Sequence, residues 1–80
     1  MERKKIEFEI SGVTKDIEKF PRREWHYLKS KPTLKQAKKV ARTKSNMKKW
    51  FEIEIRAEYE GETIHHSFWR EGRLEINMNP

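Results

Sequence analysis

Several kinds of residue and segment are missing from this sequence, and each absence narrows what the protein can be. The chain has no cysteine, which excludes disulfide bonds and zinc sites with thiolate ligands. No apolar run approaches the roughly 20 residues of a membrane-spanning helix, and no apolar block follows the charged start. We therefore expect a cytoplasmic protein with neither a membrane span nor a signal peptide, folded as one domain over residues 1–80.

Acidic residues are absent from one long segment, although they are common elsewhere. No Asp or Glu occurs between Glu24 and Glu52, whereas nine of the 19 Lys and Arg residues lie there. The rest of the chain has ten basic and 13 acidic side chains, so it carries a net charge of −3. This asymmetry predicts an electrically two-sided molecule and bears on its partners rather than on its fold.

The segment from Trp50 to Asn77 alternates between apolar and polar residues, which is typical of half-buried strands. With Glu60-Gly61 as a two-residue hairpin loop, Tyr59 pairs with Glu62, and the register continues to Ile53 with Phe68. For the second turn, a three-residue loop over Arg70-Glu71-Gly72 keeps the apolar residues on one face, pairing Phe68 with Leu74 and His66 with Ile76. We predict a three-stranded antiparallel meander with one apolar face.

Two further strands and one helix precede the meander. Alternation predicts a first strand over Lys4–Ser11, and aromatic residues indicate a second over Trp25–Lys29. Residues 13–21 form either a short helical turn or a long loop. A capping box made by Thr33 and Gln36 predicts a helix from Leu34 to about Thr43.

Together these elements predict an α+β fold of the order β-β-α-β-β-β, an antiparallel sheet of about five strands. One basic amphipathic helix packs on one face, where Ala37 and Ala41 allow a close approach. The other face is expected to carry Trp50, Trp69, His65 and Arg73 and to meet solvent or a partner.

A row of cations on the helix is the leading candidate for a binding surface. It consists of Lys35, Lys38, Lys39 and Arg42, continued beyond the helix by Lys48 and Lys49. Such a row matches the contacts that proteins make with phosphates, where each contact releases counterions. The alternative is a solvated helix face, which Lys suits by its helix propensity. The uninterrupted absence of carboxylates favours the functional interpretation.

Two tryptophans and the histidines are secondary candidates. Trp50 and Trp69 on the outer face can stack on bases or anchor a protein, or else cover each other or pack under the N-terminal loop. His65 and His66 point to opposite faces of a strand and cannot jointly hold a metal, so we expect no metal site and no cofactor. His66 is expected at the edge of the core. His65 beside Arg73 is conceivable as a general acid or base, but no other catalytic motif accompanies it, so we expect no enzyme.

The stretch Pro32-Thr33-Leu34-Lys35-Gln36-Ala37-Lys38-Lys39-Val40-Ala41, followed by the meander with its Glu-Gly turns, resembles small phage-encoded anti-CRISPR proteins over residues 25–76. One of that group blocks a type I surveillance complex. The resemblance implies a non-enzymatic inhibitor that competes for the nucleic-acid surface of a host complex, with the lysines as contacts. The longer N-terminal part, Ser11 to Glu24, departs from that pattern.

A looser resemblance, to the RelE/ParE toxins, rests on Lys15-Asp16-Ile17-Glu18-Lys19-Phe20-Pro21 and on the sheet from Phe51 to Asn77. It implies an RNase-type or gyrase-directed toxin, although the chain stops before the C-terminal element that often carries a catalytic residue in that group.

The function hypothesis is a small binding protein of phage or mobile-element type, a monomer or homodimer without a small-molecule substrate, that engages a host nucleoprotein complex. The alternative is a module that binds DNA or RNA directly, and the third possibility is the toxin.

Overall fold

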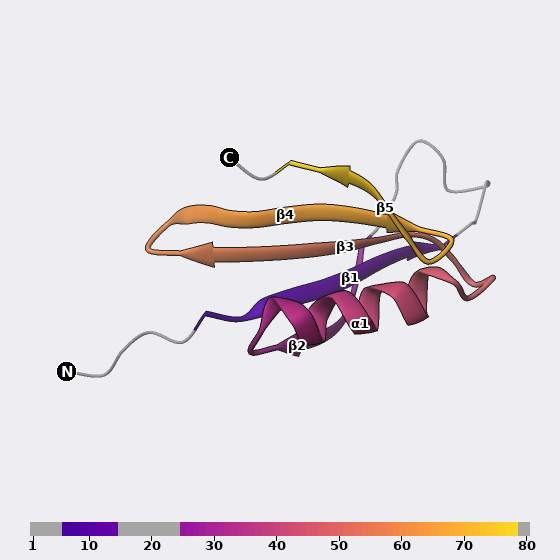
Figure 1. The fold of residues 1–80 in the computed structure, drawn as a ribbon, viewed down its shortest axis with the longest axis horizontal. Helices are drawn as coiled ribbons and strands as arrows, with labels where there is room; N and C mark the ends of the chain where they lie inside the picture. The colour runs from indigo at the N-terminus through magenta and orange to yellow at the C-terminus, as the bar shows by residue number, and fades with distance from the viewer. Residues whose placement is uncertain (1–5, 15–24, 79–80) are drawn as a thin grey trace.

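A five-stranded antiparallel sheet carries one helix on one of its faces (Figure 1). The computed structural model describes residues 6–14 and 25–78. The elements in chain order are β1 (Phe8–Thr14), β2 (His26–Lys31), α1 (Leu34–Ser45), β3 (Trp50–Tyr59), β4 (Glu62–Arg70) and β5 (Arg73–Asn77). The predicted fold class is confirmed. The predicted strand start at Lys4 and most of the ambiguous segment 13–21 lie outside the described residues.

The strands lie in the order β2-β1-β3-β4-β5. Because β1 is antiparallel to both β2 and β3, those two strands run parallel to each other with β1 between them. Parallel strands require a crossover connection, and α1 provides it. The helix therefore lies over the middle of the sheet, mainly against β3 and β1. We call the opposite side of the sheet the open face.

Local capping and one tertiary contact set the ends of α1. The Thr33 hydroxyl accepts a hydrogen bond from the backbone N–H of Gln36 at 3.3 Å, which confirms the predicted N-cap. The helix continues two residues beyond the predicted end at Thr43. Ser45 is buried there, and its Oγ accepts a hydrogen bond from the Gly72 backbone N–H in the β4–β5 turn. This contact between distant segments holds the last helical turn and is invisible in local sequence.

The core lies between α1 and the middle strands. Its buried residues are Ile10, Ala37, Ala41, Trp50, Ile53, Ile55 and Trp69. The two alanines are fully buried, so the helix backbone approaches the sheet as predicted. Gly12 is required in β1, because a Cβ atom there would come within 2.7 Å of the Trp50 ring. The missing side chain makes room for the indole.

The first hairpin turn follows the prediction, but the strands beyond it do not. Glu60 and Gly61 both have positive φ angles, as a type I′ turn requires, and Tyr59 pairs with Glu62. A bulge then shifts the register, so that Ala57 pairs with His65 instead of Ile64. The side-chain period of a strand is two, so this one-residue slip moves every later residue of β4 to the other face. The predicted pairing of Ile53 with Phe68 is therefore wrong, and Ile53 pairs with Trp69.

The second turn also differs from the prediction. It is a two-residue loop of the same type, with φ of 52° at Glu71 and 76° at Gly72, and Arg70 pairs with Arg73. A second irregularity follows, since Trp69 pairs with Leu74 but Phe68 pairs with Ile76. A three-residue loop is predicted because it would move the following strand to the other face. The bulge in β4 has already made that change of face.

Candidate nucleic-acid interface

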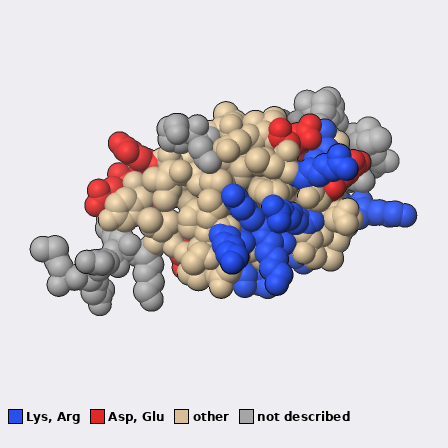
Figure 2. Space-filling model, in the orientation of Figure 1, with Lys and Arg blue, Asp and Glu red and all other residues tan. Residues whose placement is uncertain are grey.

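The nine cations of the acid-free segment come from three parts of the fold. Lys29 and Lys31 lie on β2, five more lie on α1, and two follow the helix. We call this set the cationic surface: Lys29, Lys31, Lys35, Lys38, Lys39, Arg42, Lys44, Lys48 and Lys49. Lys31, Lys38 and Lys44 are half-buried and the other six are exposed. Figure 2 shows Lys and Arg side chains gathered over α1 on the visible side of the molecule.

Carboxylates do not neutralise the cationic surface within the described part of the chain. The three ion pairs found there join Arg56 to Glu58, His66 to Glu54, and Arg70 to Glu52. All three involve sheet residues outside the cationic surface. The positive charges of the surface therefore add to one another instead of being cancelled locally.

A groove of roughly 440 Å³ runs between β2 and α1. It is lined by Lys29, Lys31, Gln36, Lys39, Val40, Thr43 and Lys44. The predicted row on the helix includes only Lys39 of these four lysines. The sequence does indicate that two of the other lysines belong together, because Lys29 and Lys31 are two apart on a strand and therefore share a face. Placing that face beside the helix requires knowledge of the sheet order.

The other side of α1, facing β4, also carries cations. The Arg42 guanidinium lies 5.7 Å from the centre of the Trp69 ring. Lys38 is half-buried and close enough to His65 for its charge to act on that ring. Lys35 and Lys39 are exposed on the part of α1 between its β2 side and its β4 side. Positive charge thus flanks the helix on both sides.

The connection from α1 to β3 extends the cationic surface past the end of the helix. Lys48 and Lys49 are exposed, and the Lys49 ammonium lies 5.0 Å from the centre of the Trp50 ring. Lys48 also lines a hollow of roughly 380 Å³ together with Phe51 and Arg70. Both lysines are placed where the sequence predicts, beyond the helix.

The predicted outward placement of Trp50 and Trp69 is wrong. Both face α1 in the core, with 7% and 3% of their surface exposed. The bulge in β4 turns Trp69 inward, where its indole N–H donates a hydrogen bond to Ser67 Oγ at 3.0 Å. Neither ring offers a free face for a nucleic-acid base. The two tryptophans instead support the cations that lie over them.

The two adjacent histidines exchange their predicted environments. His65, predicted on the outer face, is 5% exposed, and its Nε2 lies 2.7 Å from Ser67 Oγ. Burial lowers its pKa, and the charges of Lys38 and His66 lower it further. His66, expected at the core edge, lies on the open face 2.8 Å from Glu54 Oε2. A buried His65 is poorly placed to act on a substrate, and Arg73 is exposed beside the β4–β5 turn.

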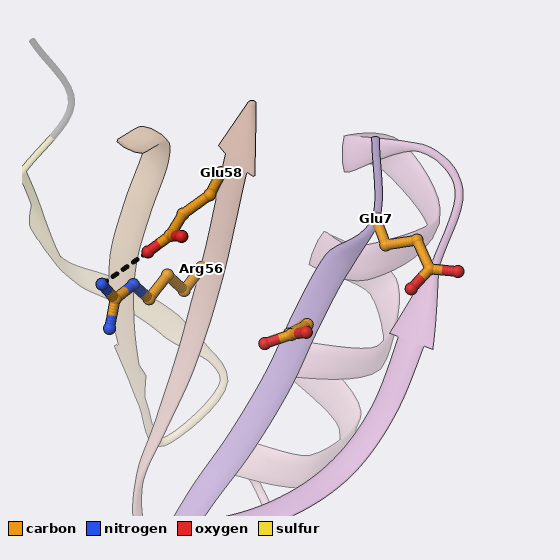
Figure 3. Close-up of a pocket in the computed structure, with 4 residues that line it drawn as sticks. Glu7, Arg56 and Glu58 are labelled. Atoms are coloured by element: carbon orange, nitrogen blue, oxygen red, sulfur yellow. Dashed lines mark hydrogen bonds and ion pairs between the residues drawn. The ribbon is translucent and has the colours of Figure 1, made fainter. Parts of the chain in front are cut away.

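A third hollow, of roughly 290 Å³, lies between β1 and β3. It is lined by Glu7, Glu9, Arg56 and Glu58. The Arg56 guanidinium binds Glu58 at 2.6 Å, whereas the Glu7 carboxylate points away from that pair (Figure 3). This region has the opposite charge to the cationic surface.

The described residues contain neither a candidate metal site nor a candidate membrane-spanning helix. No group of three or more His, Cys, Asp or Glu side chains there is arranged to hold a metal ion. Among the same residues, no helix is both long enough and apolar enough to cross a membrane. Comparisons with protein-family models, with curated proteins and with solved structures give no match to this chain.

Proposed function

We propose that this protein is a non-enzymatic binding protein that contacts the phosphates of nucleic acid through the cationic surface. The observation that carries the proposal is the grouping of nine cations from β2, α1 and the connection to β3, none of which pairs with a described carboxylate. Unpaired exposed cations that add to one another attract a polyanion.

Lysine composition indicates the type of contact. Lys is a compact point charge that binds phosphate without strong directional demands, whereas Arg makes two-pronged bonds. Eight of the nine residues of the cationic surface are Lys. Since Trp50 and Trp69 are buried, base stacking on them does not contribute. We therefore expect affinity to come mainly from phosphate contacts and to fall steeply as salt rises.

Fluorescence anisotropy with a labelled 20-base-pair DNA duplex tests this proposal. The logarithm of the binding constant should fall linearly with the logarithm of salt concentration, by about 0.9 for each phosphate contacted. A variant with Lys29→Gln, Lys35→Gln and Arg42→Gln should bind at least about tenfold more weakly and reduce the slope by roughly 1 for each lost contact.

The control carries Arg56→Gln and Arg73→Gln, two exposed cations outside the cationic surface, and should bind like the unaltered protein. A loss of affinity per removed charge that is the same in the control as in the three-residue variant would show a general effect of net charge and contradict the proposed surface.

The anti-CRISPR resemblance supplies the competing outcome. An inhibitor of a host nucleoprotein complex would not bind free DNA or RNA at about 150 mM salt, but a lysate pulldown with it would retain that complex. The lysine variant would lose the complex and the control would keep it. That combination of results would contradict direct nucleic-acid binding and support inhibition of a host complex.

A further inference from the structure

We infer that α1 enters the major groove of B-form DNA with Gln36, Lys39 and Thr43 toward the base edges. The inference rests on the proposed function and deepens it, because it names the type of nucleic acid and separates residues that read bases from those that contact phosphates.

An exposed ridge of α1, at the groove beside β2, has the composition of a reading surface. Gln36, Lys39 and Thr43 are all exposed, and a rotation of about 100° per residue places them together, opposite the buried Ala37 and Ala41. In the major groove, Gln pairs with adenine, Lys with guanine, and the Thr methyl group contacts the thymine methyl group. The Thr43 hydroxyl bonds back to the Lys39 carbonyl at 3.1 Å, so its methyl group remains for such a contact.

The cations beside this ridge match the borders of a major groove. On the β2 side, the ridge is itself part of the lining of the groove, together with Lys29, Lys31 and Lys44, and these three lysines can contact one phosphate backbone. On the β4 side, the exposed Arg42, which lies over the Trp69 ring, can contact the other. A helix with side chains is about 10–12 Å across, and the major groove of B-form DNA is about 12 Å wide. A helix with charge on both flanks and hydrogen-bonding groups at its crest fits between two phosphate chains.

The same features disfavour other nucleic acids. The major groove of an A-form RNA duplex is deep and narrow, so side chains on a helix cannot reach its base edges. Binding of single strands relies on aromatic side chains that stack on bases. Trp50 and Trp69, which lie under the cationic surface, are buried, and the exposed Trp25 and Tyr27 are turned to the open face, where Trp25 packs against Phe68. Duplex DNA is therefore the favoured ligand.

Competition binding and selection from a pool of random duplexes test the inference. A DNA duplex should displace a labelled DNA probe at least about tenfold more effectively than an RNA duplex or a single strand of the same sequence. Selection with the unaltered protein should recover a preferred sequence. The exposed substitution Gln36→Ala should relax the preference for adenine at one position by roughly 5- to 100-fold. Thr43→Ser, which removes the methyl group and keeps the hydroxyl, should relax the preference for thymine at another position.

Lys31→Gln and Lys44→Gln serve as matched variants on the flank. They should weaken binding to all duplexes equally and leave the preferred sequence unchanged. Circular dichroism checks that each variant is folded. Equal binding of DNA and RNA duplexes, or an unchanged preference in the Gln36 and Thr43 variants, would overturn the major-groove placement and leave the proposed phosphate binding intact. Absence of binding to every nucleic acid would remove both.

Discussion

Ser67 organises the polar part of an otherwise apolar core. Its Oγ accepts a hydrogen bond from the Trp69 indole and lies 2.7 Å from His65 Nε2. The three residues alternate along β4 and all face α1. A buried polar group without a partner costs about 1–3 kcal/mol, so this small network stabilises the inward placement of both rings. Two cations of α1 act on it, since Arg42 lies over the Trp69 ring and the charge of Lys38 acts on His65.

Stability should therefore depend on the protonation of His65. Because its pKa is lowered in the folded protein, the unfolded chain binds more protons once the pH falls below the ordinary histidine value of about 6.5. The contribution of His65 to the free energy of unfolding is complete above that value and is lost as the pH falls toward the lowered pKa. Urea unfolding between about pH 5 and 7.5 should show this decline, which His65→Gln should reduce.

His26→Gln is the control, since that ring is exposed on β2 and is not among the groups that lower the pKa of His65. An unchanged pH dependence in the His65 variant would show that this buried ring does not control acid sensitivity.

At the scale of the elements, the sequence predicts the type and order of each segment better than the pairing between segments. The cap at Thr33, the alternation in β3 and the Glu-Gly turns are local patterns with local causes. The register of β4 is different, because Ile64, His66 and Phe68 alternate with His65, Ser67 and Trp69. Either set can face inward, and the choice depends on a bulge and on hydrogen bonds across the core.

The two hairpin turns offer a way to stabilise the fold. Glu60 and Glu71 have φ angles of 51° and 52°, a conformation that costs most residues roughly 1–2 kcal/mol and that Asn tolerates better. Glu60→Asn should therefore raise the free energy of unfolding by up to about 1 kcal/mol, which corresponds to about 4–8 °C in melting temperature for a domain of this size.

Glu71→Asn should add a similar gain, because the two turns lie at opposite ends of β4. Glu62→Asn, placed just after the first turn, is the control and should give no increase, since Asn is disfavoured in strands. Thermal unfolding followed by circular dichroism measures all three. A lower melting temperature for Glu60→Asn would contradict the turn assignment.

At the scale of the molecule, the sequence prediction and the structure agree best on the separation of positive from negative charge. The sequence predicts two oppositely charged regions, and the cationic surface and the carboxylate-lined hollow between β1 and β3 lie in different parts of the fold. What the sequence does not supply is the contribution of β2. Lys29 and Lys31 join the helix lysines only because β1 separates β2 from β3 and the crossover returns over it.

Repulsion between the like charges of α1 should lower the free energy of unfolding of the free protein. Like-charged neighbours on a helix destabilise it, and Lys39 lies four residues from Lys35 and three from Arg42. Lys39→Glu should convert both repulsions into attractions and raise the free energy of unfolding by up to about 1 kcal/mol, while nucleic-acid binding weakens.

Urea unfolding and the anisotropy titration measure the two effects on the same samples. Lys39→Gln should lie between the unaltered protein and the Glu variant in both. If Lys39→Glu were less stable than the unaltered protein, repulsion within the cationic surface would be ruled out.

The central position of β1 also has a consequence for biosynthesis. Its pairing partner on one side, β3, is translated only after β2, α1 and their connections. At about 5–20 residues per second, the ribosome needs roughly two to seven seconds to progress from the end of β1 to the start of β3. During that delay β2 can satisfy only one edge of the nascent β1, so the other edge stays unpaired until β3 has been translated.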